Sequence, residues 1–196
     1  TFESMFASAT AFSRSLCWDL PSGATTTDMF TGSSGSISAY ASGPTPCATT
    51  SALAALYNST GGRRVWTTKL NWMAGDPCTN SWYGLTCGSS GEVNGLSIGT
   101  NQLAGMLPTQ IGLLTELGSG VAITNTLISG TLPTEIGLLQ SLTASFSARH
   151  HKIRGAVPTE LALLTNMAGS LDLSHGALAA TVPSELILLN ETLNSR

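Results

Sequence analysis

The sequence has few charged side chains and no long apolar segment. Charged residues make up 10% of the 196 positions and the formal net charge is −3, so there is no basic field to attract nucleic-acid phosphates. No apolar run approaches the roughly 18 residues of a membrane-spanning helix. Disorder is also excluded, because 42% of the residues are hydrophobic and the charge is low. The sequence predicts a folded chain that binds no nucleic acid and has no membrane span.

Cysteine is scarce as well, and the four that are present favour disulfides over metal binding. No C-x-x-C pair supplies the short ligand spacing of a zinc site. Cys78 and Cys87 enclose eight residues in a segment with Pro and Gly, and we predict a local disulfide between them. Cys17 and Cys47 either pair with each other or include a buried free thiol, and the spacing does not decide between these.

Two N-x-S/T acceptors for glycosylation occur, at Asn58 and Asn190. Together with a local disulfide they favour an extracellular, cell-surface or other oxidising compartment. Motifs for catalysis and cofactors are missing: there is no HExxH, no phosphate-binding Gly-Lys-Ser/Thr loop and no GxSxG. We therefore expect no cofactor, no metal and no enzymatic activity.

The chain is rich in Ser and Thr, which fill 51 of the 196 positions, and it repeats every 25 residues. The repeat is marked by four prolines: Pro108, Pro133, Pro158 and Pro183. Other columns keep the same period, among them Leu96, Val121, Phe146 and Leu171 twelve residues before each proline, and Ile111, Ile136, Leu161 and Leu186 three residues after it. A fixed period of this length indicates a solenoid.

Each repeat contains the parts of one solenoid rung. Apolar residues two apart, such as Leu96 and Ile98, place both side chains on one face of a short strand. The stretch that ends in proline is predicted to turn the chain, and the following Thr-Gln-Ile-Gly-Leu-Leu to return as a helical turn. Because one rung cannot bury its own apolar side, neighbouring rungs stack and their strands form a parallel sheet.

The repeat Asn101-Gln102-Leu103-Ala104-Gly105-Met106-Leu107-Pro108 resembles the plant-type leucine-rich repeat, LxxLxLxxNxLxGxLPxxLGxL. Residues 49–91 resemble the N-terminal cap of that family, with Asn71-Trp72 and the Asp-Pro-Cys…Trp-x-Gly-Leu-Thr-Cys element. The resemblance implies an α/β solenoid in which four 25-residue rungs, residues 92–196, follow the cap with parallel strands on the concave face. It also implies that the cap cysteines are bonded.

The repeats depart from the family pattern in two ways. One residue is added before each strand. The family also has an asparagine in each repeat that bonds buried backbone groups between rungs, which we call the ladder asparagine. It is present only once in its column, which reads Asn101, Thr126, His151 and Gly176. Residues 1–36 have a different repeat, in which Met5-Phe6 recurs as Met29-Phe30, and they resemble the BspA-like surface repeat. The alternative is an irregular arm packed on the cap. Residues 37–48 are predicted to be a linker.

Candidate ligand-binding residues cluster on the last two concave strands. Small side chains dominate the early strands, whereas the late ones carry the bulky and charged groups Arg149, His150, Asp172 and His175. A two-histidine metal site is a weaker reading than a pair of solvated histidines facing a ligand. Ser174, Asp172 and His175 have the residue types of a catalytic triad, but neighbours on a strand alternate faces and cannot form the relay.

The family resemblance implies a non-enzymatic module that recognises or scaffolds a protein, peptide or glycan. One alternative is a structural accessory subunit of a larger assembly, and another is an inhibitor of a secreted hydrolase. No polar cap follows the last rung, although solenoids need one. We therefore expect that further chain or a partner subunit covers the C-terminal rung.

Overall fold

A computed structural model describes Ser4, residues 7–10, 15–16, 27–29, 31–34, 36–37, 46–179 and 181–186. The chain consists of two compact units, Thr1–Cys47 and Ala48–Arg196. Each is considered by itself, and the second carries the repeats.

In the first unit, two short strands pair in parallel. They are β1 (Ser15–Leu16) and β2 (Ser36–Ile37). The backbone N–H of Ser8 donates to the carbonyl of Thr31 at 2.7 Å, and the side chain of Met29 is buried. The BspA-like resemblance remains a prediction, because Met5, Phe6 and Phe30 lie outside the described residues.

The second unit begins with a cap built around aromatic side chains. Helix α1 (Pro46–Ser59) starts inside the predicted linker, which suits proline because the first helical residue needs no N–H donor. It is followed by α2 (Gly62–Val65) and the strand β3 (Leu85–Cys87). The buried rings contact one another in series: Tyr57, Trp66, Trp72 and Trp82. The indole N–H groups of Trp72 and Trp82 donate to the carbonyls of Tyr83 and Ala74, so both tryptophans belong to the cap core.

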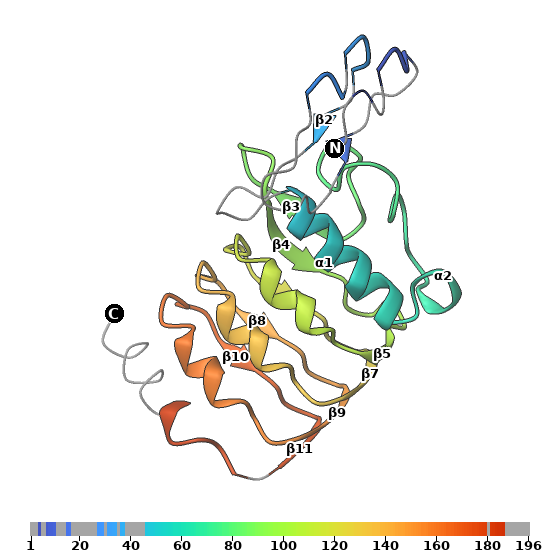
Figure 1. Cartoon of the computed structure of the whole chain (residues 1–196). Helices are drawn as coiled ribbons and strands as arrows, with labels where there is room; N and C mark the ends of the chain where they lie inside the picture. The colour runs from blue at the N-terminus through green and yellow to red at the C-terminus, as the bar shows by residue number, and fades with distance from the viewer. Residues whose placement is uncertain are drawn as a thin grey trace. The chain divides into compact units, whose positions relative to one another are not determined.

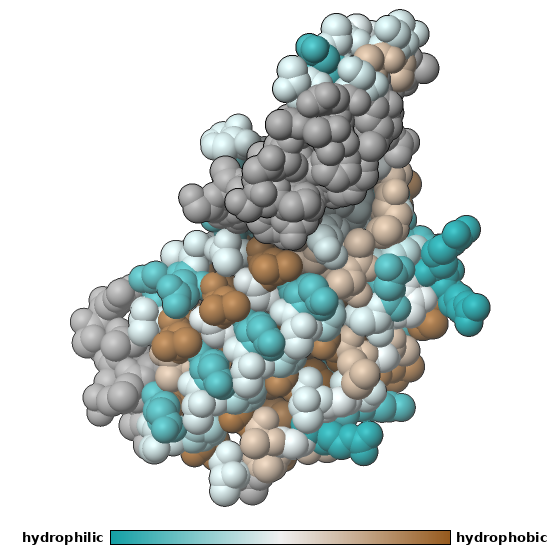
Figure 2. Space-filling view, viewed as in Figure 1, coloured by the Kyte–Doolittle hydropathy of each residue, from teal (hydrophilic) through white to brown (hydrophobic). Residues whose placement is uncertain are grey.

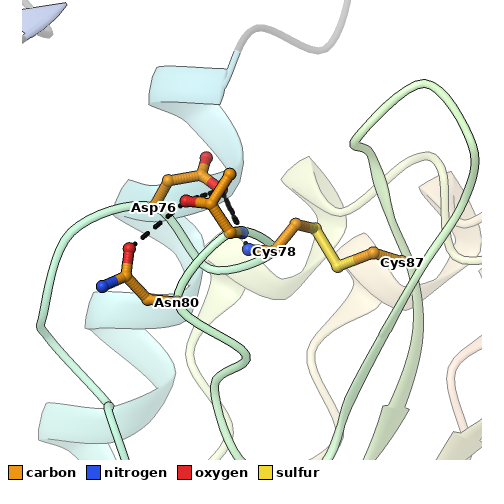
Figure 3. The surroundings of a disulfide bond; sticks show 5 residues. Asp76, Cys78, Asn80 and Cys87 are labelled. Carbon is orange, nitrogen blue, oxygen red and sulfur yellow. Dashed lines mark hydrogen bonds between the residues drawn. A yellow bond between two sulfur atoms is a disulfide. The ribbon is translucent and has the colours of Figure 1, made fainter.

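The predicted disulfide between Cys78 and Cys87 is confirmed, with a Cα–Cα distance of 5.8 Å. Asp76 holds the start of this segment, because its Oδ1 accepts hydrogen bonds from the backbone N–H groups of Cys78 and Thr79 at 3.0 and 2.9 Å (Figure 3). The other predicted pair is not described: Cys17 and the side chain of Cys47 lie outside the described residues.

The first strand of each rung joins one sheet, which forms the concave face. Its parallel strands are β4 (Val93–Ser97), β6 (Val121–Ala122), β8 (Phe146–Ser147) and β10 (Leu171–Asp172). The cap strand β3 pairs antiparallel with β4 and extends this sheet. The register pairs residues 25 apart, such as Leu96 with Val121, as the repeat predicted.

Two other faces complete the solenoid (Figure 1). The stretch predicted only to turn the chain forms a second parallel sheet, the lateral face, made of β5 (Ala104–Met106), β7 (Leu127–Gly130), β9 (Lys152–Gly155) and β11 (Ala177–Leu178). The returning turns are short 3-10 helices that form the convex face: η1 (Thr109–Leu113), η2 (Thr134–Leu138) and η3 (Thr159–Leu163). The repeated apolar columns fill the space between the three faces, with Ile98, Leu103 and Ile111 fully buried.

The ladder column shows how the first rung is attached to the cap. The Asn101 side chain accepts a hydrogen bond from the N–H of Thr68 and donates one to the carbonyl of Thr68, both at 2.6 Å. One rung later, the Thr126 hydroxyl donates instead to the carbonyl of Ile123. The asparagine therefore satisfies cap backbone groups that the other members of its column do not reach.

Candidate functional site

The concave face contains a shallow trough of about 370 Å³. We call this the trough, and it is lined by Thr86, Gly95, Leu96, Ser97, Ser119, Gly120, Val121, Ala122, Ala144, Ser145 and Ser147. It exists because the concave positions of β4, β6 and β8 carry glycine, alanine or serine, whose side chains leave room above the sheet. Thr86, on the cap strand β3, also lines it.

The trough offers hydroxyl groups and no charge. Ser97, Ser119 and Thr86 are exposed and can each donate or accept hydrogen bonds. Ser145 is already engaged, since its Oγ accepts a hydrogen bond from the N–H of Ser170 at 3.0 Å. Such a surface can hold a neutral, extended ligand by many weak contacts, and it has no acid, base or nucleophile arranged for catalysis.

Beyond the trough, the predicted residues Arg149 and Asp172 face each other across neighbouring rungs. Arg149 Nη1 lies 4.0 Å from Asp172 Oδ2. The Oδ1 atom of Asp172 accepts hydrogen bonds from the hydroxyl and N–H of Ser174, at 2.7 and 3.1 Å. These bonds lower the pKa of Asp172, and the positive charges of Arg149 and His175 lower it further. Asp172 therefore stays ionised, and because Ser174 bonds to Asp172, this geometry is not that of a Ser–His relay.

The two other predicted residues, His150 and His175, are stacked. Their ring centroids are 4.3 Å apart and the ring planes differ by 4°. Each lies between a concave strand and a lateral strand, where the backbone turns through left-handed φ values of 56° and 59°. The nitrogen lone pairs of each histidine lie in the plane of its ring. Because the two ring planes are parallel, these lone pairs do not converge on one metal ion. The described residues contain no cluster of three His, Cys, Asp or Glu side chains that could hold one.

The third histidine, His151, lies behind this pair and is 7% exposed. Its Nδ1 accepts a hydrogen bond from the N–H of Ile153 at 3.0 Å. Burial lowers the pKa of His151, the positive charge of His150 lowers it further, and the carbonyl of Leu173 acts in the opposite direction. The neutral ring therefore stabilises the turn between β8 and β9 through this hydrogen bond.

The structure brings the four predicted ligand-binding residues together in two adjacent pairs, which we call the late-rung patch: Arg149, His150, Asp172 and His175. Sequence reasoning missed the trough, which none of these four residues lines. The one available signal was the column of small residues thirteen before each proline, Gly95, Gly120, Ser145 and Ser170. Of the two glycosylation acceptors, Asn58 is exposed near the end of α1, and Asn190 lies outside the described residues.

Within the described part of the chain, no helix has both the length and the apolar character needed to cross a membrane.

Comparison with protein-family models finds no match. A curated relative, a probable leucine-rich repeat receptor-like protein kinase from Arabidopsis thaliana, is 40% identical over 47 residues. That segment is 24% of this chain and 5% of the kinase.

Solved structures share the fold over a larger part of the chain. A plant ice-binding protein superposes with a TM-score of 0.62 at 26% identity, and the match covers 71% of this chain and 44% of the ice-binding protein. The structure of PEPR1 with AtPEP1 gives a TM-score of 0.61 at 26% identity, over 71% of this chain and 19% of the other. The leucine-rich repeat ectodomain of the receptor kinase SOBIR1 from Arabidopsis thaliana gives a TM-score of 0.51 at 23% identity. This match covers 65% of this chain and 66% of the ectodomain. The chain thus spans less than half of the ice-binding protein and about a fifth of PEPR1, and its repeats have the fold of a plant-type leucine-rich repeat ectodomain.

Proposed function

We propose that this chain is a non-enzymatic recognition module that binds a protein or peptide along its concave face. The observation that carries the proposal is the trough, which leaves about 370 Å³ open above three parallel strands. An extended segment can place its side chains over Gly120 and Ala122 and form hydrogen bonds with the surrounding hydroxyls. The similarity to PEPR1, which was solved with AtPEP1, supports this reading.

The late-rung patch is proposed to give the ligand its orientation. Arg149 and the two stacked histidines provide hydrogen-bond donors, and ionised Asp172 provides an acceptor. The trough by itself is uncharged and nearly uniform along the rungs, so it cannot distinguish the two directions of an extended chain. A polar group at one end of the ligand can do so by contacting the patch.

An extracellular or lumenal location goes with this function. The disulfide of the cap needs an oxidising compartment to persist, and the exposed acceptor Asn58 is accessible to glycosylation. A glycan is the other ligand class that the hydroxyl-lined trough suits, and the partner experiment below separates it from a protein.

The test begins with identification by mass spectrometry of what co-purifies with the protein from its native source. Binding of that partner is then compared between wild type and the double variant His150→Ala/His175→Ala. The matched control is Thr100→Ala/Asn125→Ala, which alters the same column of the two earlier rungs. Weaker binding in the histidine variant alone supports the patch, whereas equal binding in all three proteins contradicts its role.

The same purification separates the alternative functions. A recognition module releases its co-purifying partner on dilution, whereas a structural accessory subunit stays bound to its assembly in fixed stoichiometry. A hydrolase inhibitor lowers the activity of a secreted hydrolase in a direct assay.

Ice binding is a second candidate function. The concave residues of β4 and β6 are small and uncharged, and they recur in register from rung to rung, as an ordered layer of water requires. The similarity to a plant ice-binding protein supports this reading. Inhibition of ice recrystallisation by wild type, lost in Ser97→Asp, would favour it over peptide recognition.

A further inference from the structure

The convex face carries a ridge of exposed leucines that the core does not need. Leu113, Leu138 and Leu163 occupy the same place in η1, η2 and η3 and are 40%, 49% and 48% exposed. Figure 2 shows apolar side chains in a row across these turns, with a row of hydrophilic ones beside it. We call these three residues the leucine ridge.

All the charges on the helical turns beside this ridge have one sign. Glu135 on η2 and Glu160 on η3 are the only charged residues of the three turns. Both are partly exposed, and each accepts a hydrogen bond only from the hydroxyl of the preceding threonine among the described side chains. An apolar ridge bordered by carboxylates fits a partner surface that is apolar and basic.

The lateral face of the same chain has that chemistry. Met106 on β5 and Leu127 on β7 are 61% and 49% exposed. On β9 the side chains alternate, so exposed Lys152 and Arg154 flank buried Ile153 and point outward together. They are the only charged residues of the four lateral strands.

The four charges have no ionic partner within the part of the chain that the structure describes, where Arg149–Asp172 is the one ion pair. Each of the two faces thus presents exposed apolar side chains together with charges of a single sign, and the signs are opposite.

We propose that copies of this chain associate through these two faces, with the leucine ridge of one copy on the lateral face of the next. Leu138 and its neighbours pack on Met106 and Leu127, while Glu135 and Glu160 lie near Lys152 and Arg154 of the second copy. Because the two faces differ, the contact is heterologous, and repeated contacts of this kind build open chains or closed rings of copies. The association is independent of ligand binding on the concave face.

A charge-swap experiment on the full chain tests this interface by sedimentation velocity at low ionic strength. Wild type is expected to sediment faster as its concentration rises, and salt weakens the effect because the ion pairs are exposed. The variant Glu135→Lys/Glu160→Lys has two basic faces, and the variant Lys152→Glu/Arg154→Glu has two acidic ones, so each alone is expected to be monomeric. Mixed in equal amounts, they restore complementary faces and associate again.

Two further variants keep the test decisive. Leu138→Ser removes the middle of the ridge and is expected to abolish association, whereas Leu70→Ser removes a leucine of the cap that is 65% exposed and leaves association unchanged. If a charge-reversed protein fails to fold, the neutral pair Glu135→Gln/Glu160→Gln is compared in its place. A wild-type protein that stays monomeric at its solubility limit overturns the proposal. So does association that persists in both charge-reversed variants, or a mixture of them that stays monomeric.

Discussion

The imidazole ring of His151 lies against the bare backbone of Gly176, its counterpart one rung later. A Cβ atom on Gly176 would overlap this ring and lie 2.7 Å from Nδ1. The backbone of Gly176 does not have a positive φ, so the position requires glycine for space and not for conformation. The loss of the ladder asparagine at residue 151 is thus matched by the loss of a side chain at residue 176.

Gly176→Ala is expected to lower the free energy of unfolding by about 1–3 kcal/mol, the usual cost of overpacking a filled site. The cost should largely disappear when His151 is also replaced by Ala, because the two residues are in contact. Urea unfolding of the wild type, the two single variants and the double variant measures this coupling. Additive effects would contradict the packing of His151 on Gly176.

Stability is expected to fall as the pH falls below about 6.5. Burial lowers the pKa of His151 from its ordinary value of 6.5, so the unfolded chain binds a proton at a higher pH than the folded chain does. The stabilising effect of the neutral ring is complete above the unfolded pKa and is lost as the pH falls through the folded pKa. Protonation of Nδ1 also breaks its hydrogen bond with the N–H of Ile153.

The variant His151→Asn should flatten this pH dependence, since asparagine can accept the same hydrogen bond without titrating. Thr126→Asn is the matched control, because it places asparagine in the same column one rung earlier and removes no titrating group. Chemical unfolding at several pH values between 5 and 8 gives the comparison. Identical slopes in wild type and His151→Asn would contradict a buried neutral His151.

Asn101→Ala is expected to destabilise the chain by about 1–3 kcal/mol, because it leaves the backbone N–H and carbonyl of Thr68 without their partner. Thr126→Ala loses a single bond to Ile123 and should cost less. Amide hydrogen exchange at Thr68 provides a local readout, which should speed up only in the asparagine variant. Equal exchange in the two variants would mean that Asn101 does not hold the cap.

Replacing Cys78 and Cys87 together by serine should reduce stability by about 2–3 kcal/mol, as expected for opening a loop of about ten residues in the chain-entropy model. The buried tryptophans of the cap, Trp72 and Trp82, give a fluorescence signal for its unfolding. Peptide mapping without reducing agent that finds two free thiols would show that the bond does not form in the native protein.

Much of the fold was predictable because the repeat is strict. A period of 25 residues placed the concave strands, the buried apolar columns and the helical turns, and the spacing of Cys78 and Cys87 indicated their bond. The lateral sheet was not predicted, because strands such as β5 contain glycine and have no alternating apolar pattern. The start of α1 at Pro46 was missed since proline more often marks a linker than a first helical residue.

Of the two parts of the candidate site, the late-rung patch was predictable from the sequence and the trough was not. Arg149 and His175 stood out as bulky, charged or titratable side chains among small ones, and the structure places them in one patch with their partners. The trough depends on the small size of residues such as Gly120 and Ala122, and on the cap residue Thr86, which β3 brings next to β4. Neither that pairing nor the open volume leaves a motif in the sequence.

Ligand recognition by the trough is tested most directly by filling it. Ala122→Trp places a large side chain in the trough, whereas Gln140→Trp adds the same group at an exposed position that does not line it. For the partner that co-purifies from the native source, calorimetry should show binding at least about tenfold weaker for Ala122→Trp, a change of about 1.4 kcal/mol, and unchanged for Gln140→Trp. Equal affinity in wild type and in both variants, with unfolding midpoints unaltered, would contradict binding at the concave face.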